Sequence, residues 1–338
     1  MNVRLRPIAG QVIVITGASS GIGLLTARDA ARRGAKVMLV ARNGAALAEI
    51  VAGIEAEGGE AAFAVADVGD AAAVAAAAEA AVARFGRIDT WVNNAGVTIY
   101  APILETPDDE HARLFRTNYF GAVHGARAAV PHLRVRGGAL ITVASIAADM
   151  PSPIMGAYAA SKHAVKALIG SLRIELQAAG APIVVTLVKP SGIATPIAQH
   201  AANHQAGEAM IPPPPYDPQL VADAILHAAE HPTREIVVGG AGRLQSLFAS
   251  HFPALFDRLA PAVIPFLSSR KPPTRSDALH APAVDGAVRS ANETGEGWSF
   301  YTAGQLHPGK AAIAGATAAL VLAGLVRAVS ARRRGNTG

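Results

Sequence analysis

Tyr158 and Lys162 are spaced four residues apart, and Ser145 precedes Tyr158 by thirteen residues. In a helix, residues i and i+4 share one face, so the Lys162 ammonium is predicted to lie beside the Tyr158 phenol. A nearby positive charge favours the phenolate and is expected to lower the pKa of Tyr158 from about 10. The phenol could then exchange a proton with a carbonyl or an alcohol near neutral pH. An exposed lysine beside a half-buried ring would show the same spacing. The surrounding sequence is therefore needed to distinguish a catalytic pair from a surface pair.

Ser145 directly follows an apolar run over residues 139–144, which is typical of a buried strand. Runs of this kind alternate with Ala-rich helical stretches such as residues 21–33 and 71–84. The predicted strands are residues 12–16, 36–41, 61–65, 90–93, 139–144, 183–188 and 235–238. Their nearly continuous hydrophobicity indicates strands buried on both faces. This pattern predicts a doubly wound, Rossmann-type α/β fold with a seven-stranded parallel sheet, helices on both faces and a C-terminal helical extension.

The composition changes after this alternating region. Apolar residues at helical spacing, interrupted by prolines, predict broken helices over residues 243–269, and a segment rich in Pro, Gly, Ser and charge predicts a disordered linker. The expected parts are a catalytic and cofactor-binding domain (1–242), a helical extension (243–269), the linker (270–309), a hydrophobic helix (310–330) and a basic tail (331–338).

The overall composition excludes several classes of protein. The 338 residues contain no cysteine, which excludes disulfides, thiolate metal sites and a cysteine nucleophile. The net charge of +5 comes partly from arginines in the tail. The rest of the chain has no basic stripe interleaved with aromatic residues, which argues against nucleic-acid binding. Because residues 1–10 contain no apolar run of signal-peptide length, the catalytic part is expected in the cytoplasm.

A glycine-rich loop at residues 16–23 follows the first predicted strand and opens a helix. Its glycines permit a tight turn and close approach to a pyrophosphate, which the N–H groups of the helix N-terminus would bind. A plain tight turn is the alternative. The context of strand, loop and helix favours nucleotide binding.

Three further positions suggest which nucleotide binds. Arg42, at the end of the second strand, offers positive charge to a 2′-phosphate and so favours NADP(H), where an acidic residue would favour NAD(H). Asp67, after the third strand, could accept a hydrogen bond from the adenine amine, or it could cap the following helix. The Asn-Asn-Ala-Gly sequence at 93–96 lets the backbone approach the adenosine, although it would also suit a simple turn.

The order of these elements, continued by Asn118 and by the Pro-Ser-Gly-Ile-Ala-Thr sequence at 190–195, resembles the short-chain dehydrogenase/reductase family over about residues 8–240. The resemblance implies a nicotinamide cofactor bound in extended form. It implies that Tyr158 is the general acid or base, that Lys162 binds the nicotinamide ribose, that Ser145 holds the substrate oxygen and that Asn118 positions a water. The residues that it assigns to the cofactor are Thr16, Gly17, Ser19, Ser20, Gly21, Ile22, Gly23, Arg42, Asp67, Val68, Asn94, Ala95, Gly96, Tyr158, Lys162, Pro190, Gly192, Ile193 and Thr195. Ser191 departs from the commoner glycine after Pro190.

The sequence therefore predicts an NADP-dependent oxidoreductase that acts on an apolar carbonyl or secondary alcohol. An NAD-linked alcohol dehydrogenase and a dinucleotide-binding regulatory protein without turnover are the alternatives. Residues 196–218 are expected to cover the substrate, and His200 and His204 lack a further ligand for a metal, so no metal site is predicted. A homo-oligomer is expected. The uncharged run at 311–326 is short for a bilayer span. It could associate with a membrane, pack on a partner subunit or form a loosely ordered tail.

Overall fold

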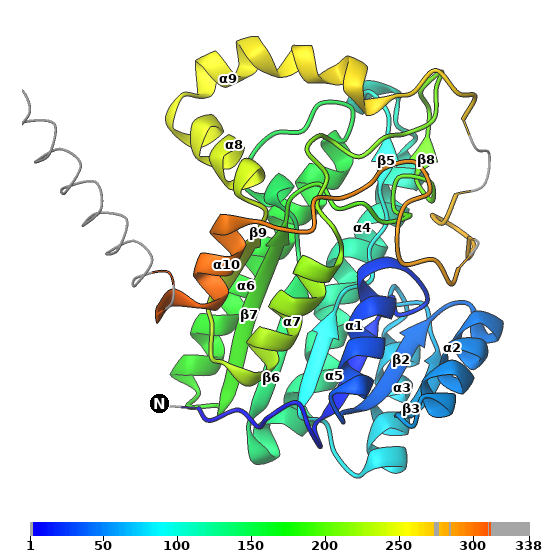
Figure 1. Ribbon diagram of the computed structural model, residues 1–338, viewed down its shortest axis with the longest axis vertical. Helices are drawn as coiled ribbons and strands as arrows, with labels where there is room; N and C mark the ends of the chain where they lie inside the picture. The colour runs from blue at the N-terminus through cyan, green and yellow to red at the C-terminus, as the bar shows by residue number, and fades with distance from the viewer. Residues whose placement is uncertain (1–2, 274–276, 284, 310, 312–338) are drawn as a thin grey trace, which may run out of the picture.

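The computed structural model describes residues 3–273, 277–283, 285–309 and 311 (Figure 1). Its centre is a seven-stranded sheet in the order β3-β2-β1-β4-β6-β7-β9, and every neighbouring pair in it is parallel. This confirms the predicted fold class. The strands are β1 (Val12–Thr16), β2 (Lys36–Ala41), β3 (Glu60–Val65), β4 (Thr90–Asn93), β6 (Gly138–Val143), β7 (Ile183–Pro190) and β9 (Glu235–Val238).

Helices cover both faces of this sheet, because alternate strand residues point to opposite sides. The helices are α1 (Gly21–Arg32), α2 (Gly44–Ala56), α3 (Ala71–Phe85), α4 (Asp108–Phe115), α5 (Gly121–Arg136), α6 (Gly156–Ala178) and α7 (Gln219–Glu230). In β1, Ile13 and Ile15 pack with α1, α2 and α7, whereas Val14 packs with α3, α5 and α6 on the other face.

The strand order reverses between β1 and β4, and the loops after the carboxyl ends of these strands open towards one edge of the sheet. Crevices at such a reversal are where open α/β sheets bind ligands. A small parallel pair, β5 (Ile99–Tyr100) with β8 (Ala202–Asn203), lies beyond this edge and ties the loop after β4 to the segment after β7. Strands of two residues give no periodic signal, so this pair was not predicted.

The broken helices predicted over 243–269 are α8 (Gly240–His251), α9 (Pro253–Leu259) and a 3₁₀ segment (Ala260–Leu267). Pro253 begins α9, where a missing N–H costs nothing, and Pro265 lies inside the 3₁₀ segment. In Figure 1 these elements, drawn in yellow, project from the top of the domain.

Residues 270–309 were predicted to form a disordered linker, but those that the structure describes pack on the domain. Helix α10 (Phe300–Leu306) docks on β9, where the Gln305 amide donates to the Val237 carbonyl at 2.7 Å and accepts from its N–H at 3.2 Å. Arg289 forms an ion pair with Asp217 at 2.7 Å. The polar composition of the segment could not predict these contacts. Many of them involve main-chain groups, which nearly every residue type carries.

The hydrophobic helix expected at 310–330 and the basic tail at 331–338 lie outside the described residues, except for Ala311. Within the described ranges, no helix is long and apolar enough to cross a bilayer.

Candidate active site

The glycine-rich loop after β1 is tied to the loop after β4. The Thr16 hydroxyl accepts hydrogen bonds from the backbone N–H groups of Asn94 and Ala95, at 3.0 and 3.1 Å. Gly17 has a φ of +66°, and a Cβ there would lie 2.7 Å from the Ala95 Cα. A Cβ at Gly23 would lie 2.2 Å from the Gly17 carbonyl oxygen. Only glycine fits both positions, and the close approach leaves the start of α1 facing a groove, as a dinucleotide requires.

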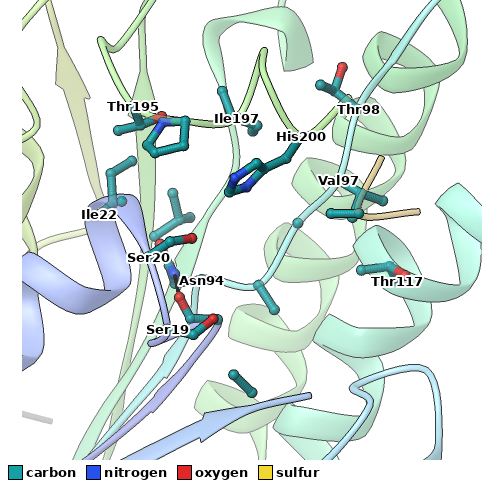
Figure 2. A pocket seen from close by; sticks show the side chains of 18 of the residues that line it. Ser19, Ser20, Ile22, Asn94, Val97, Thr98, Thr117, Thr195, Ile197 and His200 are labelled. Carbon is teal, nitrogen blue, oxygen red and sulfur yellow. Dashed lines mark hydrogen bonds between the residues drawn. The ribbon is translucent and has the colours of Figure 1, made fainter. Parts of the chain in front are cut away.

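This groove is a cavity of about 220 Å³ that most of the predicted cofactor residues line. Figure 2 shows Ser19 and Ser20 from the glycine-rich loop, Asn94 after β4, and Thr195 and His200 after β7 around it. Thr98 and Thr117 also line it, and among the described residues their buried hydroxyls have no hydrogen-bond partner. Orphaned hydroxyls of this kind fit a cavity that holds a polar ligand. The predicted residues that line the groove are Gly17, Ser19, Ser20, Gly21, Ile22, Arg42, Asp67, Val68, Asn94, Ala95, Gly96, Tyr158, Lys162, Pro190, Ile193 and Thr195.

Thr16, Gly23 and Gly192 were predicted to bind the cofactor but do not line this cavity. Thr16 and Gly23 shape the loop from behind, as described above. Gly192 lines a neighbouring cavity, and a Cβ there would lie 2.4 Å from the Pro212 carbonyl oxygen. Thr16 and Gly23 therefore support the groove through backbone geometry, and Gly192 supports the wall of the neighbouring cavity.

Asp67 and Arg42 have partners of their own at the adenosine end. Asp67 accepts from the Gly69 N–H at 2.8 Å and pairs with Arg113 at 2.6 Å, whereas the cap of α3 is Asp70. Burial alone would raise the pKa of Asp67, but these two partners hold it below its usual value. Asp67 therefore does not cap α3, which was the alternative reading.

The Arg42 guanidinium donates to main-chain carbonyls of the segment expected as a linker, including those of Leu279 at 3.4 Å and Ala281 at 3.2 Å. Burial and then the charge of Arg113 lower the pKa of Arg42, which nevertheless stays charged. The sequence predicted that Arg42 offers its positive charge to a 2′-phosphate. Arg42 lines the groove, and chain from more than 230 residues downstream also contacts it.

Ser145, Tyr158 and Lys162 come together as the spacing predicted. Ser145 follows β6, and its hydroxyl, which accepts from the Ala147 N–H at 3.1 Å, lies near enough to the Tyr158 phenol to lower its pKa. Tyr158 and Lys162 lie one turn apart on α6, and the Lys162 ammonium is 5.5 Å from the centre of the Tyr158 ring. The ammonium also donates to the Val143 carbonyl at 3.2 Å. The arrangement holds two hydroxyls and an ammonium at one place.

The pKa of Tyr158 does not shift in the predicted direction. Burial raises the pKa of Tyr158 to about 12, and the Ser145 hydrogen bond lowers it only in part. Burial also lowers the pKa of Lys162 to about 8. Removal from water disfavours the charged form of each group, and this outweighs their attraction. The phenol therefore keeps its proton at neutral pH.

Asn118 lies in a π-helical turn (Arg116–Phe120) between α4 and α5, a distortion frequent at functional sites. Its amide nitrogen donates to the Val97 carbonyl and the Ser161 hydroxyl, both at 3.0 Å, and its oxygen accepts from the Val97 N–H at 2.9 Å. A Cβ on Gly96 would lie 3.4 Å from this oxygen and 3.5 Å from the Lys162 ammonium. Asn118 is thus near Lys162, but both of its side-chain N–H groups are already used.

A second cavity, of about 430 Å³, adjoins the first. Its walls are mostly apolar and come from α8, α9, the 3₁₀ segment and the loops after β6 and β7. Ser145 and Tyr158 line both cavities. The two hydroxyls therefore face a molecule in either space, which is the geometry of an oxidoreductase that brings a dinucleotide and a substrate together.

Several lining residues were missed by the sequence predictions. Thr98 and Thr117 could have been suspected as polar residues near the end of β4 and before Asn118. Ala278, Pro282, Ala283 and Asp285 also line the first cavity, and no local pattern marked them.

Comparison with known proteins agrees with an oxidoreductase that binds a dinucleotide. The family whose model matches residues 11–206 is described as short chain dehydrogenase, and this protein belongs to that family. The uncharacterized oxidoreductase YxnA of Bacillus subtilis is 39% identical, over 98% of this chain and 93% of its own. An 11-beta-hydroxysteroid dehydrogenase A of Sesamum indicum is 36% identical, over 68% of this chain and 65% of its own. The solved alcohol dehydrogenase of Thermococcus sibiricus, complexed with 5-hydroxy-NADP, aligns with a TM-score of 0.60 at 25% identity, over 68% of this chain and 95% of its own.

Proposed function

We propose that this protein is an NADP(H)-dependent oxidoreductase that interconverts an apolar ketone and its secondary alcohol. The observation that carries the proposal is the position of the Ser145 and Tyr158 hydroxyls, which line both the dinucleotide groove and the apolar cavity. A carbonyl oxygen bound between the two cavities would meet both hydroxyls. The cofactor, when bound, supplies or accepts the hydride.

The chain's own residues supply the rest of the reduction. Ser145 and Tyr158 donate hydrogen bonds to the carbonyl oxygen, where negative charge grows as hydride arrives. Because its pKa is raised to about 12, Tyr158 is protonated and ready to act as the general acid. Lys162, one turn after Tyr158 on α6, lines the groove and would hydrogen-bond a ribose hydroxyl there. Asn118 would act by holding the π-helical turn against Val97 and α6.

The shape and chemistry of the second cavity support a bulky apolar substrate. A volume of about 430 Å³ is within the usual range for a drug-sized ligand. Its apolar walls include Met150, Met155, Phe248, Phe256 and Phe266. They offer few partners for polar groups away from the reacting oxygen. A steroid-like or terpenoid-like ketone fits these properties, and one relative of this chain is an 11-beta-hydroxysteroid dehydrogenase.

NADP(H) is favoured over NAD(H) because Arg42 lines the groove where the second strand ends. The solved alcohol dehydrogenase that aligns with this chain holds an NADP derivative. An NAD-linked alcohol dehydrogenase is the alternative within the same family.

An assay of NADPH and NADH oxidation with a panel of ketones tests the proposal. We expect turnover with apolar cyclic ketones and NADPH, and a loss of turnover in Ser145→Ala. Faster turnover with NADH would favour the alternative. Tight dinucleotide binding without turnover on any carbonyl or alcohol would favour a regulatory protein.

We also propose that the protein associates with lipid. Large apolar side chains are exposed on the helices above the apolar cavity, with Leu244 at 69%, Phe252 at 58% and Phe266 at 63%. Contact with a bilayer would cover this surface and bring apolar substrates close to the cavity. Co-sedimentation of the full chain with phosphatidylcholine–phosphatidylglycerol vesicles tests it, and a chain that stays in the supernatant contradicts it.

A further inference from the structure

A segment near the C-terminus crosses the dinucleotide groove. We call residues 277–290, apart from Val284, the strap (orange in Figure 1). The strap bonds to both sides of the groove through the main chain. Gly286 N–H donates to the Ser19 carbonyl at 2.9 Å, and the Gly21 N–H donates to the Ala287 carbonyl at 2.9 Å. On the opposite side, the Ser290 N–H donates to the Ala194 carbonyl at 2.9 Å.

The strap is also anchored at the adenosine end of the groove. The Leu279 side chain is buried in the apolar cluster that contains Leu114 and Tyr158. The Leu279 carbonyl accepts hydrogen bonds from two guanidinium groups, that of Arg113 at 2.8 Å and that of Arg42 at 3.4 Å. These contacts hold the strap beside two guanidinium groups, of which that of Arg42 lines the groove.

One acidic side chain of the strap points into this positively charged corner. The Ser19 hydroxyl donates to the Asp285 carboxylate at 2.8 Å. Asp285 lines the same cavity as Arg42, and its negative charge acts on that guanidinium. A carboxylate therefore lies where a serine of the glycine-rich loop and the arginine after β2 both face an anion.

We propose that Asp285 is a residue that determines cofactor specificity, because its carboxylate competes with the 2′-phosphate of NADP(H) for Ser19 and Arg42. The 2′-phosphate has to displace this carboxylate, since two like charges side by side repel. NAD(H) has a hydroxyl at the same position, which can donate to a carboxylate that stays in place. Arg42 thus favours the phosphate while Asp285 opposes it. This inference rests on the proposed dinucleotide binding.

The test compares dissociation constants of NADPH and NADH for the full chain and for Asp285→Asn, measured by calorimetry at one ionic strength. Asparagine keeps an acceptor for the Ser19 hydroxyl, so only the charge changes. We expect NADPH to bind about three- to tenfold more tightly and NADH to change less than about twofold. Asp257→Asn on the exposed face of α9 loses the same charge outside the groove and should alter neither constant.

The fragments 2′,5′-ADP and 5′-AMP give a second measurement that contains only the adenosine end. They should show the same selective gain for the 2′-phosphate in Asp285→Asn. If both members of each pair change by equal factors, or neither changes, Asp285 does not face the 2′-phosphate and the inference is overturned. If the unaltered chain binds neither dinucleotide, the proposed function itself fails, which is a separate and recognisable result.

Discussion

The Lys162 ammonium lies 5.5 Å from the centre of the Tyr158 ring, and each side chain is at least nine-tenths buried. Burial keeps the phenol neutral, because removal from water raises the pKa of Tyr158 to about 12 although an ammonium lies nearby. A neutral phenol suits a general acid. The protonation states of these two residues should therefore give the rates of reduction and oxidation different pH dependences.

Oxidation and reduction should respond differently to pH. Reduction needs the protonated phenol, which is present below a pKa of about 12, so its rate should vary little while Lys162 is protonated and should fall above the Lys162 pKa of about 8. Oxidation needs the phenolate, whose fraction grows about tenfold per pH unit below the pKa. The oxidation rate should therefore rise through neutral pH, and the rise should slow above about pH 8, where Lys162 loses its ammonium. Steady-state kcat/KM in both directions checks this, and an oxidation plateau near pH 7 would contradict it.

Tyr158→Phe should remove turnover and keep cofactor binding. The phenol supplies the proton, and general acid catalysis typically contributes about 10²–10⁴ in rate. NADPH affinity, measured by fluorescence, should change less than about threefold because the ring remains in the groove wall. Tyr301→Phe, which removes the hydroxyl of an exposed ring, is the matched control. Near-normal kcat in purified Tyr158→Phe would identify another group as the acid.

Lys162→Ala should reduce both turnover and cofactor affinity. The ammonium lines the groove and lies against the Tyr158 ring, so its loss affects binding and chemistry together. We expect at least a tenfold loss in each, about 1.4 kcal/mol. Lys166→Ala, one turn further along α6, removes a half-exposed ammonium paired with Asp149 and should have little effect. Equal cofactor affinity in Lys162→Ala and the parent would show that the lysine contributes to turnover but not to cofactor binding.

Arg42→Ala should shift cofactor preference towards NADH. NADPH should bind more than about tenfold less tightly, because a half-buried guanidinium that would face the phosphate is lost. Arg42 also holds the strap, so both cofactors should weaken somewhat, and the ratio of the two dissociation constants isolates the phosphate. Arg258→Ala on α9 removes an exposed charge as the control. An unchanged ratio would exclude Arg42 as the phosphate ligand.

Gly125→Ala should destabilise the domain, whereas Gly53→Ala should not. Both glycines lie inside helices, but a Cβ at Gly125 would lie 1.9 Å from the Asn93 side-chain oxygen, and one at Gly53 meets nothing within 4 Å. We expect a loss of about 1–3 kcal/mol at Gly125 and a gain of about 0.5–1 kcal/mol at Gly53. Thermal unfolding of both variants checks this, at about 2–4 °C per kcal/mol. Equal melting temperatures for Gly125→Ala and the parent protein would show that helix α5 shifts enough to accommodate the added methyl group.

The sequence by itself determined the parallel sheet, the glycine-rich loop and the joint position of Ser145, Tyr158 and Lys162. These features depend on short-range periodicity and spacing, and each strand or helix carries its own pattern. The boundaries of β6 and β3 moved by a single residue, because the ends of an element depend on hydrogen bonds to its neighbours.

Only the tertiary structure decided the environment of these residues. The contact between Arg42 and the carbonyl of Leu279 joins positions 237 apart, and the Ser19–Asp285 bond joins positions 266 apart. No local pattern can encode such pairs, because they depend on the path of the whole chain. The pKa of Tyr158 also depends on the tertiary structure. The sequence showed the neighbouring charge, but the depth of burial that reversed its effect comes from packing against distant segments.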